Sequence, residues 1–434
     1  MFLFYWLIAI LPLEQHDLWG RVLFGNFTVI KLLGLAVFLY ALGYACWKGR
    51  WPSFRGPMAC SVLVFISLQV ANYFFHVADL QNFWMAYSHV ISILILFISS
   101  LILIDSRRRL HWSLLAALGA VAFVSLHVLR QWQLYRGTFV GFRPGGMLAD
   151  SNYYALVAGL WIPLAFLWSM NQGRPKWERL YCFGCLMVAL AGSMVASSRG
   201  GFLGLMTAFA WIIWQSPHRV RNTVLAGVLI VPISVWFPGS PLRRLTDPSS
   251  GDNGGKEARL VAWRAGIRMI EAHPLAGVGL QNFRPEMERY EGQGEEVISL
   301  AHNTYIELTA ELGVFGGLAF VGVFATVFIR LERVRRRAVA RRCQYLATTA
   351  LALQAGVLSF VVSAVFLSAW WDKMTWLLVC ACVCLERTAP AWFREAARRS
   401  SRASATRRPE SRHVHDEEEI VGAVLPDSLA SPQG

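Results

Sequence analysis

The chain has 434 residues, of which 55% are hydrophobic and 16% are charged, and its formal net charge is +14. Soluble domains hold about 25% charged residues, so this composition excludes an ordinary cytosolic enzyme, a disordered chain, a coiled coil and a small disulfide-stapled domain. The class that remains is a multi-span membrane protein, in which an excess of basic residues is typical of cytoplasmic loops rather than of nucleic-acid binding.

Apolar segments long enough to cross a bilayer occur along most of the chain. A hydrocarbon core of about 30 Å requires roughly 20 apolar helical residues. We therefore predict an all-α polytopic bundle of about 12 transmembrane helices, of which the first and eighth are short and the last two nearly touch. The predicted spans are 2–13, 28–46, 57–75, 84–104, 110–129, 151–170, 180–197, 200–215, 220–237, 304–329, 345–368 and 369–386.

The distribution of Lys and Arg predicts the orientation of these spans. If the N-terminus is cytoplasmic, the inner segments hold 26 of the 41 basic residues, whereas a short outer connection such as 76–83 holds none. Cytoplasmic loops carry such an excess, so both termini are predicted to be cytoplasmic. The inner segments are 47–56, 105–109, 171–179, 216–221, 330–344 and the tail from 387. The tail is rich in Ser, Pro and charge, and we predict that it is disordered.

Three segments predicted on the outer side are rich in charge, although charge on this side does not help to orient the chain in the membrane. They are 130–150, the junction 197–201 and the long loop 238–303. In the first of them, Arg143 opens a Pro-Gly-Gly turn, and Asp150 or Ser151 can cap the helix that starts near Asn152. A turn does not require a guanidinium, so Arg143 is a candidate for binding an anion.

The junction 197–201 reads Ser-Ser-Arg-Gly-Gly between two apolar runs. Arg199 must therefore lie near the membrane boundary, where a buried guanidinium needs an anionic partner. Lipid headgroups reached by snorkelling are one such partner. A bound phosphate is the other, because the adjacent glycines and serines could let backbone N–H groups approach the same anion, as at helix N-termini.

The long loop contains an amphipathic pattern that ends at Pro274. An apolar stripe forms at helical spacing, with Arg259 along one edge and Arg264 and Arg268 along the other. This pattern predicts an interfacial helix that either holds a lipid-linked phosphate or is a simple surface helix. The stripe consists of Leu260, Trp263, Ile267 and Ile270. The Gly277-Val-Gly279 that follows is placed wrongly for a dinucleotide site, and we interpret it as a tight turn.

A histidine opens the tenth predicted span from the outer side. His302 can take a proton near neutral pH, although a helix-start histidine bonded to backbone is the simpler interpretation. Glu307 and Glu311 follow four residues apart. Glu311 falls about 180° from His302 on a helical wheel, so we expect it to serve packing through a buried hydrogen bond rather than to orient the ring.

Taken together, these motifs resemble the O-antigen ligase/polymerase superfamily over about residues 140–325. The resemblance rests on SSRGG after an apolar helix, then R-x-x-x-W-R-x-G-x-x-M-I-x-x-H-P-L-x-G-V-G-x-x-N-F, then A-H-N-x-Y-x-E-L-x-x-E-L-G. It implies a metal-independent glycosyltransferase at the outer, periplasmic face of the bacterial inner membrane, with an undecaprenyl-diphosphate-linked glycan as donor. A ligase passes the glycan to a lipid A–core sugar, a polymerase to another repeat unit, and some relatives pass it to protein.

The resemblance also suggests roles for individual residues. Arg199 matches the junction arginine and Arg259 the loop arginine that hold the diphosphate, and His302 matches the histidine proposed as the base. Arg264 is a weaker match, and Arg143 lies in a turn like that of many polymerases, which leaves ligase and polymerase both open. The expected partners are the lipid-linked donor, a glycan, lipid A–core or protein acceptor, and the bilayer. No metal, cofactor or nucleic acid is expected.

The predicted organisation is a membrane protein with its chemistry on one face. It comprises N-terminal spans (1–130), central spans with outer-face turns (131–237), the long periplasmic loop (238–303), C-terminal spans (304–386) and a disordered cytoplasmic tail (387–434). A lipid-linked glycan transporter or flippase is the rival from another class. It would place ionisable residues deep in several spans, whereas the predicted spans are nearly free of charge and the distinctive residues gather at one side.

Overall fold

The computed structural model describes residues 1–13, 22–24, 27–49, 51–76, 80–136, 142–148, 150–236, 253–292 and 300–406. Each of the twelve predicted spans overlaps a helix among the described residues, but the predicted spans 345–368 and 369–386 also include a non-helical connection at 364–372. The long helices before the outer loop are α2 (Val29–Lys48), α3 (Pro57–Phe75), α4 (Leu80–Leu103), α5 (Arg107–Tyr135), α6 (Ser151–Met170), α7 (Lys176–Ala196), α8 (Arg199–Gln215) and α9 (Arg219–Trp236). After the loop come α13 (Thr304–Ala340), α14 (Gln344–Ser363) and α15 (Lys373–Thr406).

Shorter elements connect these helices. The chain begins with α1 (Phe2–Ile10) and a 3₁₀ turn at Leu11–Leu13, and a small hairpin follows, formed by β1 (Val22–Phe24) and β2 (Phe27–Thr28). A second 3₁₀ turn lies at Gly146–Leu148, and the long outer loop contributes α11 (Asn253–Ala272) and α12 (Phe283–Tyr290). In the described part of the chain, nine helices are long and apolar enough to cross a membrane. The predicted polytopic helical bundle is therefore confirmed, and the count of twelve spans stays a prediction.

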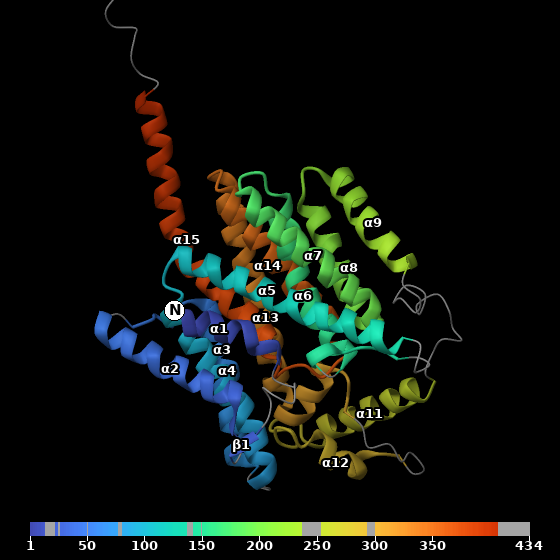
Figure 1. Cartoon of the computed structure of the whole chain (residues 1–434). Coiled ribbons are helices and arrows are strands. Elements are labelled where there is room, and N and C mark those ends of the chain that lie inside the picture. The colour runs from blue at the N-terminus through green and yellow to red at the C-terminus, as the bar shows by residue number, and fades with distance from the viewer. Residues whose placement is uncertain are drawn as a thin grey trace, which may run out of the picture.

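The core of the bundle forms where α6 and α14 lie at its centre (Figure 1). Both helices are apolar around most of their circumference, as is typical of helices without a solvent-facing side. Small residues bring the backbones close together. A Cβ at Gly356 of α14 would lie 2.3 Å from the carbonyl oxygen of Leu160 in α6, and one at Gly204 of α8 would lie 2.5 Å from that of Ser359 in α14.

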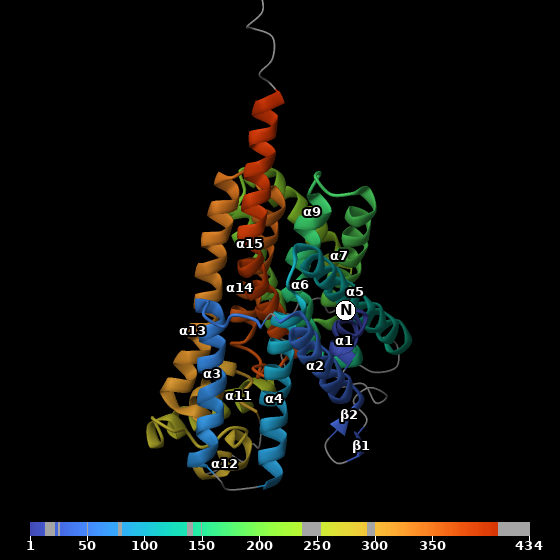
Figure 2. The same ribbon diagram turned by 90° about the vertical axis from the view of Figure 1, so that its left-hand side faces the viewer.

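The two ends of the bundle contain different segments of the chain. Segments that we predicted on the inner side meet at one end: Arg107 pairs with Glu395 at 2.7 Å, and the Arg335 Nη2 donates to Gln215 at 2.9 Å. Figure 2 shows α15 extending from this end, while α11 and α12 lie at the other. The alternation of segments agrees with the predicted threading, and the assignment of each end to a compartment stays a prediction.

One predicted boundary is wrong. The tail was predicted to be disordered from residue 387, but α15 continues to Thr406, and residues 407–434 lie outside the described part of the chain. The first turns beyond 387 are held by tertiary contacts that composition does not reveal. Trp392 is buried, and Arg387 Nη1 donates to the Leu101 carbonyl at 2.7 Å.

The amphipathic helix forms where it was predicted, but it packs with a different face. Its buried side chains are Ala262, Ala265 and Met269, which contact α12 and the start of α13. Leu260 and Ile267 of the predicted apolar stripe are 50% and 48% exposed. The small side chains of Ala262 and Ala265 permit close approach of the helices, so this face packs. Leu260 and Ile267 stay exposed on the side of the helix that carries the arginines.

The outer loop is docked onto a break in α13. Gly313 interrupts that helix with φ 72° and ψ 179°, and residues of the Gly277-Val-Gly279 turn use the carbonyls freed there. Val278 N–H donates to the Ala310 carbonyl at 2.8 Å, and Gly279 N–H donates to the Glu311 carbonyl at 3.0 Å. Gly277 has φ 67°, and a Cβ there would lie 2.4 Å from the Glu311 carbonyl carbon. The predicted turn is therefore also the contact that fixes the loop to the bundle.

Candidate active site

The arginine of the 197–201 junction stands at the first position of α8. Ser197 ends α7 in the left-handed region with φ 56°, and the Ser198 hydroxyl accepts from the Gly201 N–H at 3.3 Å as the N-cap of α8. Arg199 follows directly, and its guanidinium has no hydrogen-bond or ion-pair partner among the described residues. The tight turn thus places a guanidinium at a helix N-terminus, where the helix dipole also favours an anion.

The arginine of the first outer segment is held from two sides. Arg143 Nε donates to the Ala196 carbonyl at 3.2 Å, and Arg143 Nη2 donates to the Asn152 side-chain oxygen at 2.9 Å. Asp150 caps α6 as predicted, since its carboxylate accepts from the N–H groups of Asn152 and Tyr153 at 2.6 and 3.1 Å. The cap therefore orients the start of α6, and through Asn152 it positions Arg143 beside the end of α7.

The third arginine comes from the amphipathic helix. Arg259 lies on α11, one turn before Trp263, and the Trp263 indole N–H donates to the Ala301 carbonyl at 2.8 Å. This bond ties α11 to the segment that precedes α13. Arg259 is thereby held beside the segment that carries His302.

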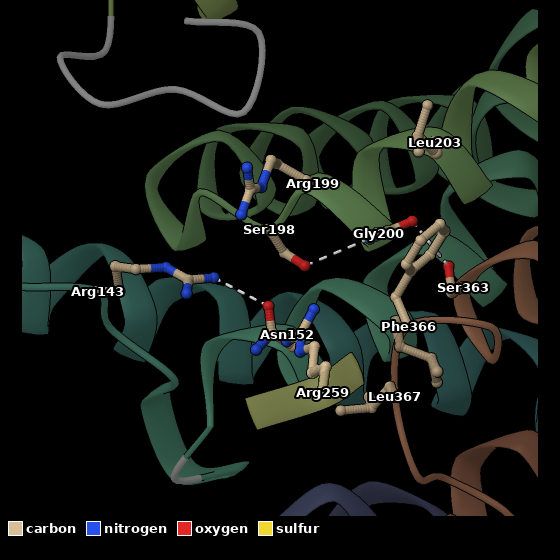
Figure 3. A pocket seen from close by; sticks show the side chains of 12 residues that line it. Arg143, Asn152, Ser198, Arg199, Gly200, Leu203, Arg259, Ser363, Phe366 and Leu367 are labelled. Carbon is tan, nitrogen blue, oxygen red and sulfur yellow. Dashed lines mark hydrogen bonds between the residues drawn. The ribbon is translucent and has the colours of Figure 1, made fainter. Parts of the chain in front are cut away.

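These three arginines line one pocket of about 280 Å³ (Figure 3). Three segments distant in sequence thus bring their guanidinium groups together, and no Asp or Glu is among the described residues that line the pocket. The opposite wall is apolar and includes Phe366 and Leu367 from the connection between α14 and α15. The lining residues are Arg143, Asn152, Leu156, Ser198, Arg199, Gly200, Gly201, Leu203, Arg259, Ser363, Phe366 and Leu367.

The glycines of the junction serve packing. A Cβ at Gly201 would lie 2.5 Å from the Ala155 Cβ, and one at Gly200 would lie 2.8 Å from the Phe366 Cβ. Their absence of side chains lets α8 approach α6 and the α14–α15 connection closely. The first residues of α8 in this way line the pocket.

His302 lies beside the pocket without lining it. It precedes Asn303, whose side-chain oxygen caps α13 by accepting from the N–H groups of Tyr305 and Ile306 at 3.0 and 3.2 Å. The Nδ1 atom of His302 is buried and has no hydrogen-bond partner in the described part of the chain. Burial lowers the pKa of His302, the nearby Arg259 charge lowers it further, and Asp150 acts in the opposite direction. The imidazole is therefore neutral at neutral pH and able to accept a proton.

Arg264, the fourth arginine predicted for the site, does not share the pocket. It is exposed on α11. Five residues beyond Arg259 correspond to about 1.4 helical turns, so the two side chains point in different directions. The weaker motif match and the geometry agree in separating Arg264 from the other three.

The sequence did not indicate the apolar wall. Phe366 and Leu367 fall where two predicted spans, 345–368 and 369–386, nearly touch. Hydropathy does not distinguish an apolar loop from the end of a helix, so the connection between α14 and α15 was hidden. The sequence also did not indicate the role of Asn152, because its side chain contributes by holding Arg143 through a hydrogen bond between segments.

The fold and the pocket define a class: a polytopic helical membrane protein with an arginine-lined pocket at one end and a histidine of lowered pKa beside it. Residues 183–321 match the family model of O-antigen ligase. The match supports placing the chain in the O-antigen ligase superfamily, and with it an enzyme of the ligase and polymerase kind, a membrane glycosyltransferase. The matched residues include Arg199, Arg259 and His302 but not Arg143. No curated protein matches the chain.

Proposed function

We propose that this protein transfers a glycan from undecaprenyl diphosphate to an acceptor hydroxyl, on lipid A–core or another surface glycan, at the periplasmic face of the bacterial inner membrane. The observation that carries the proposal is the pocket in which Arg143, Arg199 and Arg259 converge from three separate segments. A cationic pocket at the end of an apolar bundle suits a ligand whose diphosphate lies at headgroup height while its prenyl chain stays in lipid.

In this proposal, the arginines hold the diphosphate of the donor. A guanidinium stays charged and meets phosphate oxygens with two parallel N–H groups. Arg199 is available for such a contact because it has no hydrogen-bond or ion-pair partner among the described side chains. Negative charge on the diphosphate grows as the glycosidic bond breaks, so fixed cations stabilise the transition state more than the ground state.

His302 acts as the general base. Its lowered pKa keeps the imidazole neutral, so it can take the proton of the acceptor hydroxyl while the oxygen attacks the anomeric carbon. The new bond joins the acceptor oxygen to that carbon. The bond between the carbon and the diphosphate oxygen breaks, and its electron pair leaves with undecaprenyl diphosphate. The activated donor supplies the free energy, and the proposal involves neither a metal nor a cofactor.

The test is transfer from a lipid-linked glycan in vesicles by His302→Ala and Arg199→Ala, compared at equal membrane levels. A matched control is Arg289→Ala, because Arg289 lies on α12 outside the pocket and pairs only with Glu286 at 2.8 Å among described acidic residues. We expect loss of transfer in the first two variants and normal transfer in the third. Normal transfer by both His302→Ala and Arg199→Ala would overturn the proposal.

Repeat-unit polymerase is the second candidate. It is favoured by Arg143, which lines the pocket from a turn of the kind found in polymerases. The products that accumulate in a knockout strain separate the two activities. Loss of a ligase leaves long unattached chains on the lipid carrier, whereas loss of a polymerase leaves single repeat units. Glycosylation of protein would appear as the loss of a glycoprotein with surface glycans intact.

A further inference from the structure

The connection between α14 and α15, residues 364–372, forms one wall of the arginine pocket. Phe366 and Leu367 face the pocket from this connection (Figure 3). The same connection is attached to the start of α13, the helix that His302 precedes. The position of this connection therefore affects both the binding of the diphosphate and the positioning of the general base.

Backbone contacts with Thr304 form the first attachment. Thr304 N–H donates to the carbonyls of Ala364 and Leu367 at 2.9 and 3.1 Å. Its hydroxyl donates to the Leu367 carbonyl at 2.5 Å and accepts from the Ala369 N–H at 3.0 Å. The pocket wall is thus attached to a residue two positions after His302.

Two hydrogen bonds, made by the side chains of Ser368 and Tyr153, form the second attachment. The Ser368 hydroxyl donates to the carboxylate of Glu307 in α13, and the Tyr153 hydroxyl of α6 donates to the Ser368 carbonyl. Glu307 is only 1% exposed. Tyr153 follows Asn152, the residue that holds Arg143. Glu307 and Ser368 thereby join α13, the pocket wall and the helix that positions an arginine.

We propose that Glu307 is a positioning residue of this enzyme: through Ser368 it sets the pocket wall relative to the helix start that carries His302. The proposal rests on the proposed function. A buried carboxylate is expensive to desolvate, and an apolar side chain of similar volume is often no less stabilising. Glu307 therefore acts by fixing the geometry of the site. Glu307 contacts neither donor nor acceptor and is not a catalytic residue.

Glu311 provides the matched comparison. It lies one turn further along the same helix and is also buried, at 2% exposure. As predicted, it takes part in packing through a buried hydrogen bond, since its Oε1 accepts from the Phe283 N–H at 3.4 Å. That contact faces the docked outer loop rather than the pocket wall. Removal of either carboxylate disturbs the same helix, but only removal of Glu307 takes away a hydrogen bond to the pocket wall, the one from Ser368.

The test compares Glu307→Ala, Glu307→Gln, Ser368→Ala and Glu311→Ala in the full-length protein, with kcat, KM for the acceptor and thermal melting measured for each. A misplacement of about 1 Å can cost about 100-fold in rate. We therefore expect kcat to fall about 10- to 100-fold in Glu307→Ala and Ser368→Ala, with KM for the acceptor within about 3-fold. Glu307→Gln keeps an acceptor oxygen for Ser368 and should recover most of kcat. Glu311→Ala should melt earlier and keep its kcat.

The combination of Glu307→Ala with Ser368→Ala tests the link itself. If the two act through one hydrogen bond, the double variant is no worse than either single variant. Additive losses, a loss in Glu307→Gln as large as in Glu307→Ala, or equal losses of kcat in Glu307→Ala and Glu311→Ala would each overturn the inference. His302→Ala separates the two proposals: if it abolishes transfer while Glu307→Ala is normal, only the positioning role fails.

Discussion

Replacement of Arg199 should separate ligand binding from folding more cleanly than replacement of Arg143. The Arg199 guanidinium has no hydrogen-bond or ion-pair partner among the described residues, whereas that of Arg143 donates hydrogen bonds to Ala196 and Asn152. A hydrogen bond to a charged group contributes about 1.5–3 kcal/mol, and about 1.4 kcal/mol corresponds to tenfold. Arg199→Ala should therefore lower kcat/KM for the lipid-linked donor roughly 10- to 150-fold.

The same change should leave the folded state nearly as stable as before, within about 0.5 kcal/mol. Arg143→Ala should lower kcat/KM and also destabilise the protein by about 3 kcal/mol or more, because its charged guanidinium donates to Ala196 and Asn152 and each such bond contributes about 1.5–3 kcal/mol. Arg199→Lys keeps the charge and loses the planar fork, so its kcat/KM should fall between wild type and Arg199→Ala. The assays are transfer kinetics in vesicles and thermal melting of the purified protein. If Arg199→Ala melts much earlier than wild type or keeps full kcat/KM, the reasoning is refuted.

Three further outcomes follow from the geometry. Arg259→Gln removes a cation that lowers the pKa of His302, so the acid limb of the pH profile of kcat/KM should move to higher pH; an unmoved limb would show that the limb does not report this histidine. Arg264→Ala should change kcat/KM less than about 3-fold, since Arg264 does not line the pocket, and a loss comparable to Arg199→Ala would return it to the site. Gly277→Ala should destabilise the protein by about 1–3 kcal/mol, because the residue has φ 67° and no room for a Cβ; wild-type melting would contradict the docking of the outer loop.

Features that depend on local sequence were predicted well. Every predicted apolar run contains a helix among the described residues, since a run of some 20 apolar residues in lipid satisfies its backbone as a helix. The cap at Asp150 and the helix that ends before Pro274 also follow from chemistry within a few residues. The arginines were predicted as site residues because a guanidinium near the membrane boundary needs an anionic partner, and the histidine because it can take a proton near neutral pH.

Features that depend on distant contacts were not predicted. The helix of residues 387–406 is polar enough to resemble a tail, yet its first turns pack on α4 and α5 through Arg387 and Trp392. The face that α11 buries was decided by the small size of Ala262 and Ala265. Neither the apolar wall of the pocket nor the link from Glu307 to Ser368 has any signature within one segment.

The sequence by itself determined that this chain is a helical membrane protein with cationic residues and a histidine in segments of the same predicted side, because hydropathy and charge act residue by residue. Only the tertiary structure decided which of those cations meet. Arg143, Arg199 and Arg259 share a pocket and Arg264 does not, because helix rotation and close packing at small residues fix the direction of each side chain.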